Sequence, residues 1–159
     1  MTEGKVFYLT KEKFKELQKE YENLVAFERN KTIGVEAPKI FESEDMNPEF
    51  ISYHEDMDSL RLKIDELNNI LKNHQIIKNP PKNEQDSIGV GATILVDVNG
   101  KKEEFTVVGT LEANPDLGKI SNESPVGMAL LGRKVGQEIV IDAPTKKVYK
   151  IKNIKYEIT

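Results

Sequence analysis

The sequence predicts an α+β protein in which an N-terminal antiparallel coiled-coil hairpin precedes a β domain with one short helix. Apolar residues between Asn47 and Leu71 follow a coiled-coil repeat, and the pattern changes to strict alternation after residue 87. In addition, Ser124-Pro125 is a typical helix start within the second half. We expect the hairpin in residues 1–77 with its tip at 38–47, a linker in 78–87 and the β domain in 88–159.

The second arm of the hairpin is the best-defined element. Its apolar positions are Phe50, Tyr53, Met57, Leu60, Ile64, Leu67 and Leu71, spaced alternately by three and four residues. This spacing is the 3.5-residue repeat of a coiled-coil seam, which needs a partner helix. Asn47 suits the N-cap and Pro48 the first helical position, and we expect the helix to run to about Gln75.

The first arm supplies that partner, because Phe14, Leu17, Tyr21 and Leu24 have the same spacing after a predicted N-cap at Thr10. The seam weakens beyond Val25 and Phe27, and Pro38 should end the arm. A short loop then forces the two helices to run antiparallel and places Glu42, Glu44 and Asp45 at the tip.

In the second half of the sequence, apolar and polar residues alternate, which predicts a small sheet. We expect strands at 92–98, 104–109, 117–120, 137–142 and 147–158, with a hairpin turn at Asn99-Gly100. Ser124 and Pro125 begin a helix that Gly132 ends. The prediction is four or five antiparallel strands wrapped on one helix.

Composition excludes several classes of protein. The chain has no cysteine, which excludes a disulfide framework, and no run approaches 18 apolar residues. Residues 1–77 contain 11 Lys and Arg against 16 Asp and Glu, and the rest contains 12 against 11. Such a balance lacks the basic footprint of a duplex-DNA binder. We expect a cytoplasmic monomer with no membrane contact and no sequence-specific DNA binding.

No complete active site stands out, so an independent enzyme is not expected. Gly89-Val90-Gly91 is too short for a phosphate loop and precedes a strand. His54 and His74 are isolated and are expected to be ordinary helix residues. The tip acids remain: carboxylates can share Mg²⁺, but a pair holds it weakly because the ion prefers six oxygens. They suit half of a site that another protein completes, or else a simple solvated loop.

One stretch carries a family resemblance. Residues 120–136, ISNESPVGMALLGRKVG, resemble the C-terminal signature of the bacterial GreA/GreB transcript cleavage factors. Leu9-Thr10-Lys11-Glu12 and Asn47-Pro48-Glu49-Phe50 are similar to the family's opening and to the start of its second arm. The resemblance implies an FKBP-like C-terminal domain that docks at the secondary channel of RNA polymerase. It also implies a hairpin that brings two acids to the Mg²⁺ held by the polymerase, where a backtracked RNA 3′ end is hydrolysed.

The resemblance assigns residues to these roles. Aligned forward from Glu36-Ala37, Glu42 and Asp45 take the positions of the acid pair that shares the polymerase's Mg²⁺, with Glu44 as a substitute. Aligned backward from Asn47, the two positions become Ser43 and Met46, and the pair is lost. For docking, the resemblance points to the helix start at Ser121, Ser124, Pro125 and Gly127.

Three alternatives stay open. The tip departs from the family's Gly-Asp-x-x-Glu-Asn, so the protein could instead be a channel-binding inhibitor without cleavage activity. A prolyl isomerase is disfavoured, because residues 84–159 contain only Phe105, Tyr149 and Tyr156 as aromatics and the chain has no Trp. A plain coiled-coil adaptor would have no affinity for polymerase.

Overall fold

The computed structural model describes residues 4–32, 48–142 and 145–157. The chain divides into two compact units, one formed by Phe14–Asn73 and the other by Met1–Lys13 together with His74–Thr159. Residues 1–13 and 74–77, which the sequence analysis assigns to the hairpin, therefore group with the β domain. Among the described residues, no helix has both the length and the hydropathy that a membrane span requires.

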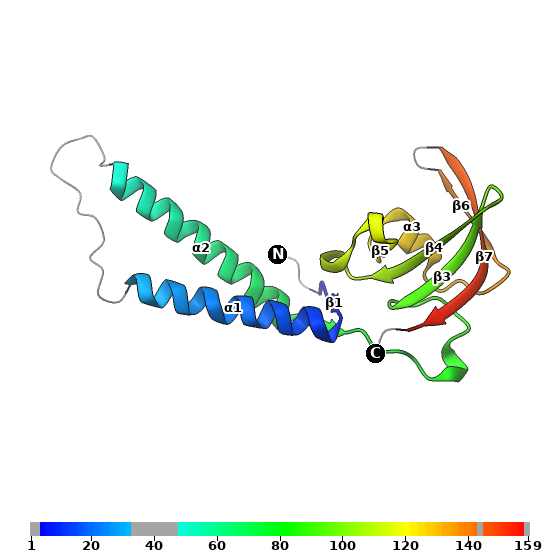
Figure 1. Ribbon diagram of the computed structural model, residues 1–159, viewed down its shortest axis with the longest axis horizontal. Helices are drawn as coiled ribbons and strands as arrows, with labels where there is room; N and C mark the ends of the chain where they lie inside the picture. The colour runs from blue at the N-terminus through cyan, green and yellow to red at the C-terminus, as the bar shows by residue number, and fades with distance from the viewer. Residues whose placement is uncertain (1–3, 33–47, 143–144, 158–159) are drawn as a thin grey trace. The chain divides into compact units, whose positions relative to one another are not determined.

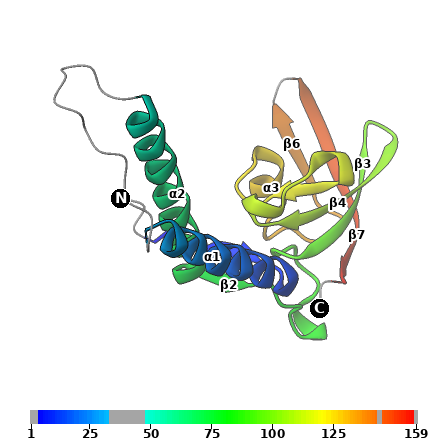
Figure 2. The ribbon, with the colours of Figure 1, turned by 60° about the vertical axis from the view of Figure 1, so that its left-hand side comes forward.

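The first unit consists of helices α1 (Lys11–Thr32) and α2 (Pro48–Lys72). Ion pairs join Glu20 to Lys63 at 3.1 Å and Glu28 to Arg61 at 3.5 Å. Because the residue numbers rise along α1 as they fall along α2, the helices run antiparallel, as predicted. Figures 1 and 2 show α1 and α2 separating toward the end of α1 and the start of α2.

Burial in this unit confirms the predicted seam. Every seam side chain is buried or half-buried, and Leu17, Met57, Ile64 and Leu67 are the buried ones. The sequence predicts that the seam weakens beyond Val25 and Phe27, and these two side chains are already 38% and 51% exposed. A single narrow apolar stripe therefore joins the two helices.

The end of α2 corrects two expectations. The helix stops at Lys72 instead of Gln75, and His74–Ile76 forms strand β2, so His74 is a strand residue. Strand β2 pairs in parallel with β1 (Phe7–Leu9), and the Ile77 amide donates to the Leu9 carbonyl at 2.8 Å. Leu9 and Ile77 are both buried, so burying them in the second unit outweighs continuing the helix.

The second unit contains a curled five-stranded sheet (Figure 1). Its strands, in the order β5-β4-β3-β7-β6, are β3 (Ala92–Val98), β4 (Lys101–Val108), β5 (Lys119–Ser121), β6 (Glu138–Asp142) and β7 (Lys146–Tyr156). The pairs are antiparallel except β4–β5, which is parallel. The sheet is therefore mixed rather than purely antiparallel. Two 3₁₀ turns, η2 (Thr110–Glu112) and η3 (Pro115–Leu117), lie between β4 and β5 and return the chain so that β5 runs in the same direction as β4.

One short helix, α3 (Pro125–Leu130), completes the core. Its Leu130 is fully buried with Ile94, Val96, Val107 and Ile151 of the sheet, which confirms the predicted fold class. Burying side chains of this size contributes about 1.5–3 kcal/mol each.

The segment before β3 is fastened to the sheet. It contains a 3₁₀ turn, η1 (Lys82–Glu84), in the range predicted as linker. The Tyr156 hydroxyl donates to the Ser87 carbonyl at 2.6 Å and accepts from the Gly89 amide at 2.8 Å. Burial raises the pKa of Tyr156, which further favours the protonated hydroxyl that makes both bonds.

Candidate functional site

The predicted site has two parts, and the first is the acidic tip. Glu42, Glu44 and Asp45 lie outside the described residues, so their prediction as acids that share Mg²⁺ rests on the sequence alone. Within residues 4–32, 48–142 and 145–157, no three His, Cys, Asp or Glu side chains gather in a metal-binding cluster.

The second part is the start of α3, where Ser124 makes two hydrogen bonds. Its hydroxyl oxygen accepts from the Gly127 amide at 3.0 Å, which is the expected N-cap bond. The same hydroxyl donates to the Ser121 carbonyl at 2.6 Å. Ser124 therefore caps the N-terminus of α3 and also links it by a hydrogen bond to the end of β5.

Gly127 allows that close approach. A Cβ atom at this position would lie 2.0 Å from the Ser121 carbonyl oxygen, so no larger residue fits without a backbone shift. Gly127 is also buried. Ser124 and Gly127 thus fix the backbone at the helix start, and the exposed side chains there are those of their neighbours.

The most polar of these neighbours is Glu123, which is held in one orientation. The Thr110 hydroxyl donates to Glu123 Oε2 at 2.6 Å, and the Glu123 amide donates to Ser121 Oγ at 3.0 Å. Thr110 and Ser121 are themselves hydrogen-bonded at 2.9 Å, and Lys5 Nζ lies 3.6 Å from Glu123 Oε2. These four side chains form one network around an exposed carboxylate.

The network favours the charged form of Glu123. The Thr110 hydrogen bond is the main cause that lowers the pKa of Glu123, and the Lys5 charge lowers it further, while partial burial acts in the opposite direction. Glu123 is therefore an oriented and exposed anion at neutral pH.

Apolar side chains continue the surface along α3. Pro125 is exposed and Met128 is 60% exposed. We call Glu123, Pro125 and Met128 the α3 surface. An oriented charge beside exposed apolar groups is a combination that protein interfaces use for specificity and affinity.

Sequence reasoning predicted Pro125 here but missed Glu123 and Met128. Glu123 lies within the signature stretch, between Ser121 and Ser124, and its charged type in that position was a usable signal. Thr110 gave no signal, because only the return of the chain through η2 and η3 brings it to Ser121.

Comparisons with known proteins cover both units. The family described as "Transcription elongation factor, GreA/GreB, C-term" matches residues 82–156. Transcription elongation factor GreA of Thermomicrobium roseum is 34% identical over 138 residues, covering 86% of this chain and 88% of the relative. The GreA of Mycoplasma genitalium is 35% identical over 158 residues, covering 92% and 96%.

Two solved structures are also similar. The GreA factor homolog 1 (Gfh1) of Thermus thermophilus is 22% identical with a TM-score of 0.42, covering 95% of this chain and 99% of that one. The GreA/GreB factor of Nitrosomonas europaea is 19% identical with a TM-score of 0.43, covering 94% and 99%. Because the GreA relatives match this sequence nearly from end to end, this chain belongs to the GreA/GreB family of transcription elongation factors.

Proposed function

We propose that this protein enters the secondary channel of RNA polymerase and stimulates cleavage of backtracked RNA by the polymerase's own active site. The observation that carries the proposal is the extent of the family match, since relatives named transcription elongation factor GreA cover both the hairpin and the β domain. The reaction belongs to the polymerase, and this chain supplies a part of the site.

The hairpin is the part suited to entering a channel. Helix α2 has 25 residues, which corresponds to about 37 Å at 1.5 Å per residue. Within the described residues, α1 and α2 alone share the seam, so the rod is thin as well as long. Glu42, Glu44 and Asp45 belong to the segment that follows α1 and precedes α2 in the sequence, and the sequence predicts this segment as the tip of the hairpin.

The tip acids have the donor chemistry for Mg²⁺. Carboxylate oxygens are ligands that this ion prefers, but two carboxylates leave most of its six positions unfilled. Glu42 and Asp45 would therefore add ligands to an ion held mainly by the polymerase. A second metal ion in such a site stabilises the attacking and leaving oxygens of phosphoryl transfer.

The α3 surface is the proposed docking surface. Glu123 offers an oriented charge, while Pro125 and Met128 offer exposed apolar area. Ser121 holds Glu123, and Ser124 with Gly127 sets the position of the helix start. Because the partner is a cytoplasmic enzyme, we place this protein in the cytoplasm, acting as a monomer without reading DNA sequence.

The experiment is cleavage in a deliberately backtracked elongation complex with Mg²⁺. The wild-type protein should shorten the RNA to a product that re-extends. The double variant Glu42→Ala with Asp45→Ala should lose about 10²-fold or more in cleavage rate, because even a misplacement of about 1 Å can cost a catalytic group that much. The variant should still bind polymerase. Met128→Glu should instead weaken binding and cleavage together.

A matched control removes another Glu and Asp three residues apart. Glu55→Ala with Asp58→Ala changes two exposed side chains of α2 and should cleave like the wild type. If the tip variant also cleaves like the wild type, the assignment of Glu42 and Asp45 is wrong.

A second candidate, inhibition of the polymerase, is favoured by the tip itself. Three acids within residues 42–45, with Asp and Glu exchanged relative to the family, could occupy the metal without promoting cleavage. Unchanged RNA together with slower nucleotide addition in the same complexes would support this candidate over cleavage.

A further inference from the structure

The turn between β3 and β4 contains the only Asn-Gly pair in the sequence. Asn99 has a φ of 52° and Gly100 a φ of 88°, and both residues are exposed. Positive φ at both positions is the geometry of a type I′ hairpin turn, which Asn-Gly suits. The pair is fixed in this turn because Val98 and Lys101 pair across the strands on either side.

An Asn followed by Gly is also chemically reactive. The backbone nitrogen of the following residue can attack the Asn side-chain carbonyl, and Gly presents no Cβ to hinder the approach. The attack requires that this nitrogen first lose its proton. The fate of the Gly100 N–H therefore decides how readily Asn99 reacts.

In the folded protein this N–H is engaged. The Gly100 amide donates to Asp97 Oδ1 at 2.8 Å. A hydrogen bond to a carboxylate stabilises the protonated amide and holds its peptide plane in place. A neighbouring negative charge also disfavours the nitrogen anion that the attack needs.

We propose that Asn99 is a site of spontaneous deamidation and that Asp97 restrains the reaction in the folded protein. The Gly100 nitrogen loses its proton and bonds to Asn99 Cγ, the Cγ–NH₂ bond breaks, and ammonia leaves a five-membered succinimide. Water then opens the ring at either carbonyl, giving Asp or isoaspartate at position 99. The sum is consumption of one water and release of one ammonia, with no change of oxidation state.

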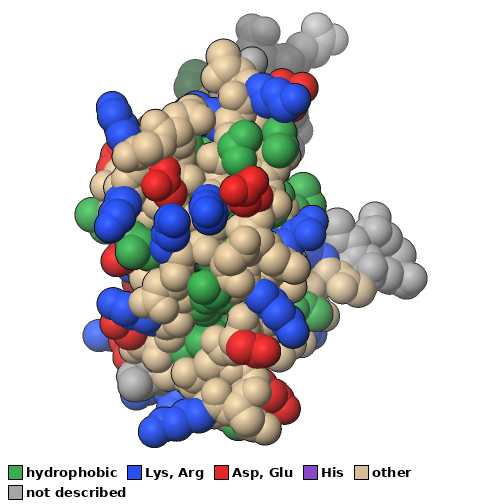
Figure 3. All heavy atoms as spheres, turned by 90° about the vertical axis from the view of Figure 1, so that its right-hand side faces the viewer, with side chains coloured by type: hydrophobic (Ala, Val, Ile, Leu, Met, Phe, Trp, Pro, Cys, Tyr) green, Lys and Arg blue, Asp and Glu red, His purple; other side chains and the backbone are tan. Residues whose placement is uncertain are grey.

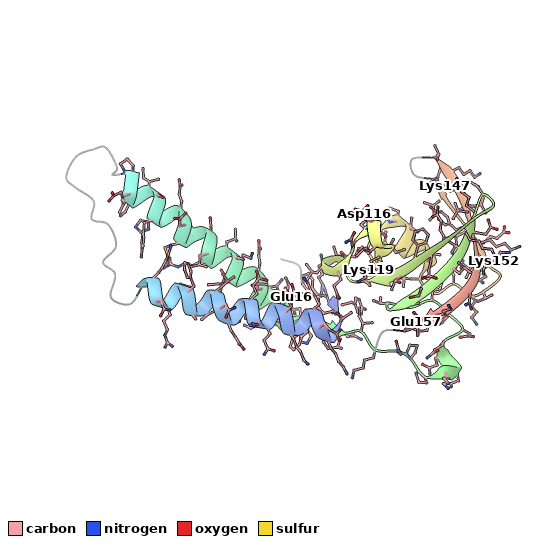
Figure 4. The ribbon with its side chains drawn as sticks, in the orientation of Figure 1. Glu16, Asp116, Lys119, Lys147, Lys152 and Glu157 are labelled. Atoms are coloured by element: carbon pink, nitrogen blue, oxygen red, sulfur yellow. The ribbon has the colours of Figure 1, made fainter. Side chains whose placement is uncertain are left out.

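The product would change a defined surface. Asn99 and Gly100 line an open groove of about 320 Å³ together with Asp97, Glu138, Val148, Lys150 and Lys152. Figure 3 shows the domain face with acidic and basic side chains interspersed, and Figure 4 labels Lys152 on β7. Deamidation adds one carboxylate beside two exposed lysines, and the isoaspartate form also lengthens the backbone of a two-residue turn.

The test follows isoaspartate at position 99 in the full-length chain, by peptide mapping with mass spectrometry during incubation at mildly alkaline pH. The folded wild type should react more slowly than the same chain in denaturant. Asp97→Ala should accelerate the folded protein about tenfold, as expected for loss of a hydrogen bond to a charged group. In denaturant the wild type and variant should react alike.

Glu138→Ala is the matched control, because it removes a carboxylate from the same groove without touching the Gly100 amide. If Asp97→Ala does not fold, Asp97→Asn keeps an acceptor of the same shape and should show a smaller acceleration. Absence of isoaspartate at position 99 even in denaturant would show that Asn99 is not a deamidation site. Equal rates for Asp97→Ala and Glu138→Ala, or a slower rate for Asp97→Ala, would overturn the restraint by Asp97.

Discussion

At the scale of single residues, the start of α3 separates groups that build a surface from groups that can meet a partner. The Ser124 hydroxyl bonds to the Ser121 carbonyl and the Gly127 amide, and the lack of a side chain at Gly127 allows the Ser121 carbonyl to approach closely. Glu123 is held by its neighbours but keeps its charge exposed. A substitution at Gly127 would therefore act through folding, whereas one at Glu123 would change the charge of the exposed surface and, in the proposed function, weaken docking.

The pKa of Glu123 depends on Thr110, and this dependence can be measured. Thr110→Val removes the hydrogen bond that is the main cause of the lowered pKa, so the pKa of Glu123 should rise toward its usual value. Lys5→Met should also raise it, because the charge and the hydrogen bond of Lys5 both lower the pKa of Glu123. NMR titration of the Glu123 side-chain carbon measures both. An unchanged pKa in Thr110→Val would contradict the network.

The contribution of Glu123 to the stability of the fold depends on pH. Because the folded-state pKa of Glu123 is lowered, the carboxylate's contribution to stability is present above its unfolded value of 4.5. The contribution is lost as pH falls below that value and through the folded pKa. Since the group is largely exposed, the effect on total stability is small.

At the scale of elements, the hairpin depends on one seam. Leu67→Ala should lower the free energy of unfolding of the hairpin by about 2–5 kcal/mol, because Leu67 is 5% exposed and its loss leaves a cavity. Leu62→Ala makes the same chemical change five residues away on the same helix, where the side chain is 61% exposed. Loss of helical circular dichroism in urea measures both. Equal losses in the two variants would contradict the seam.

The elements also show what the sequence could and could not predict. The strand β3, the turn at Asn99-Gly100 and the Ser124 cap each carry a local signal, and each forms as predicted. Strand β2 carries none: His74–Ile76 becomes a strand only because β1, far away in the sequence, supplies its partner. A three-residue strand without alternation cannot be told from the end of a helix.

Thr10 illustrates the same limit within one residue. Its predicted capping role is confirmed, since its hydroxyl accepts from the Lys13 amide at 3.2 Å. The Thr10 hydroxyl and amide also donate to Glu112 at 2.6 and 2.9 Å, which local sequence could not reveal. Likewise, the signature stretch located the α3 surface, but Thr110 reached it only through the fold.

At the scale of the whole molecule, the family match extends over both units, so a thin two-helix rod and a β domain with an exposed α3 surface are parts of one factor. In the proposed function, the rod reaches into the polymerase channel and the α3 surface attaches the protein to the polymerase. In this proposal, Glu42 and Asp45 complete a metal site inside the polymerase.

The most direct test is the Mg²⁺ dependence of RNA cleavage in backtracked complexes saturated with this protein. If Glu42 and Asp45 contribute ligands, their double alanine variant should need more Mg²⁺ for half-maximal cleavage, and excess Mg²⁺ should restore part of the rate. Ser43→Ala with Met46→Leu, which changes the positions of the backward alignment, should leave the dependence unchanged. An identical Mg²⁺ dependence for the wild type and the Glu42/Asp45 variant would contradict the claim.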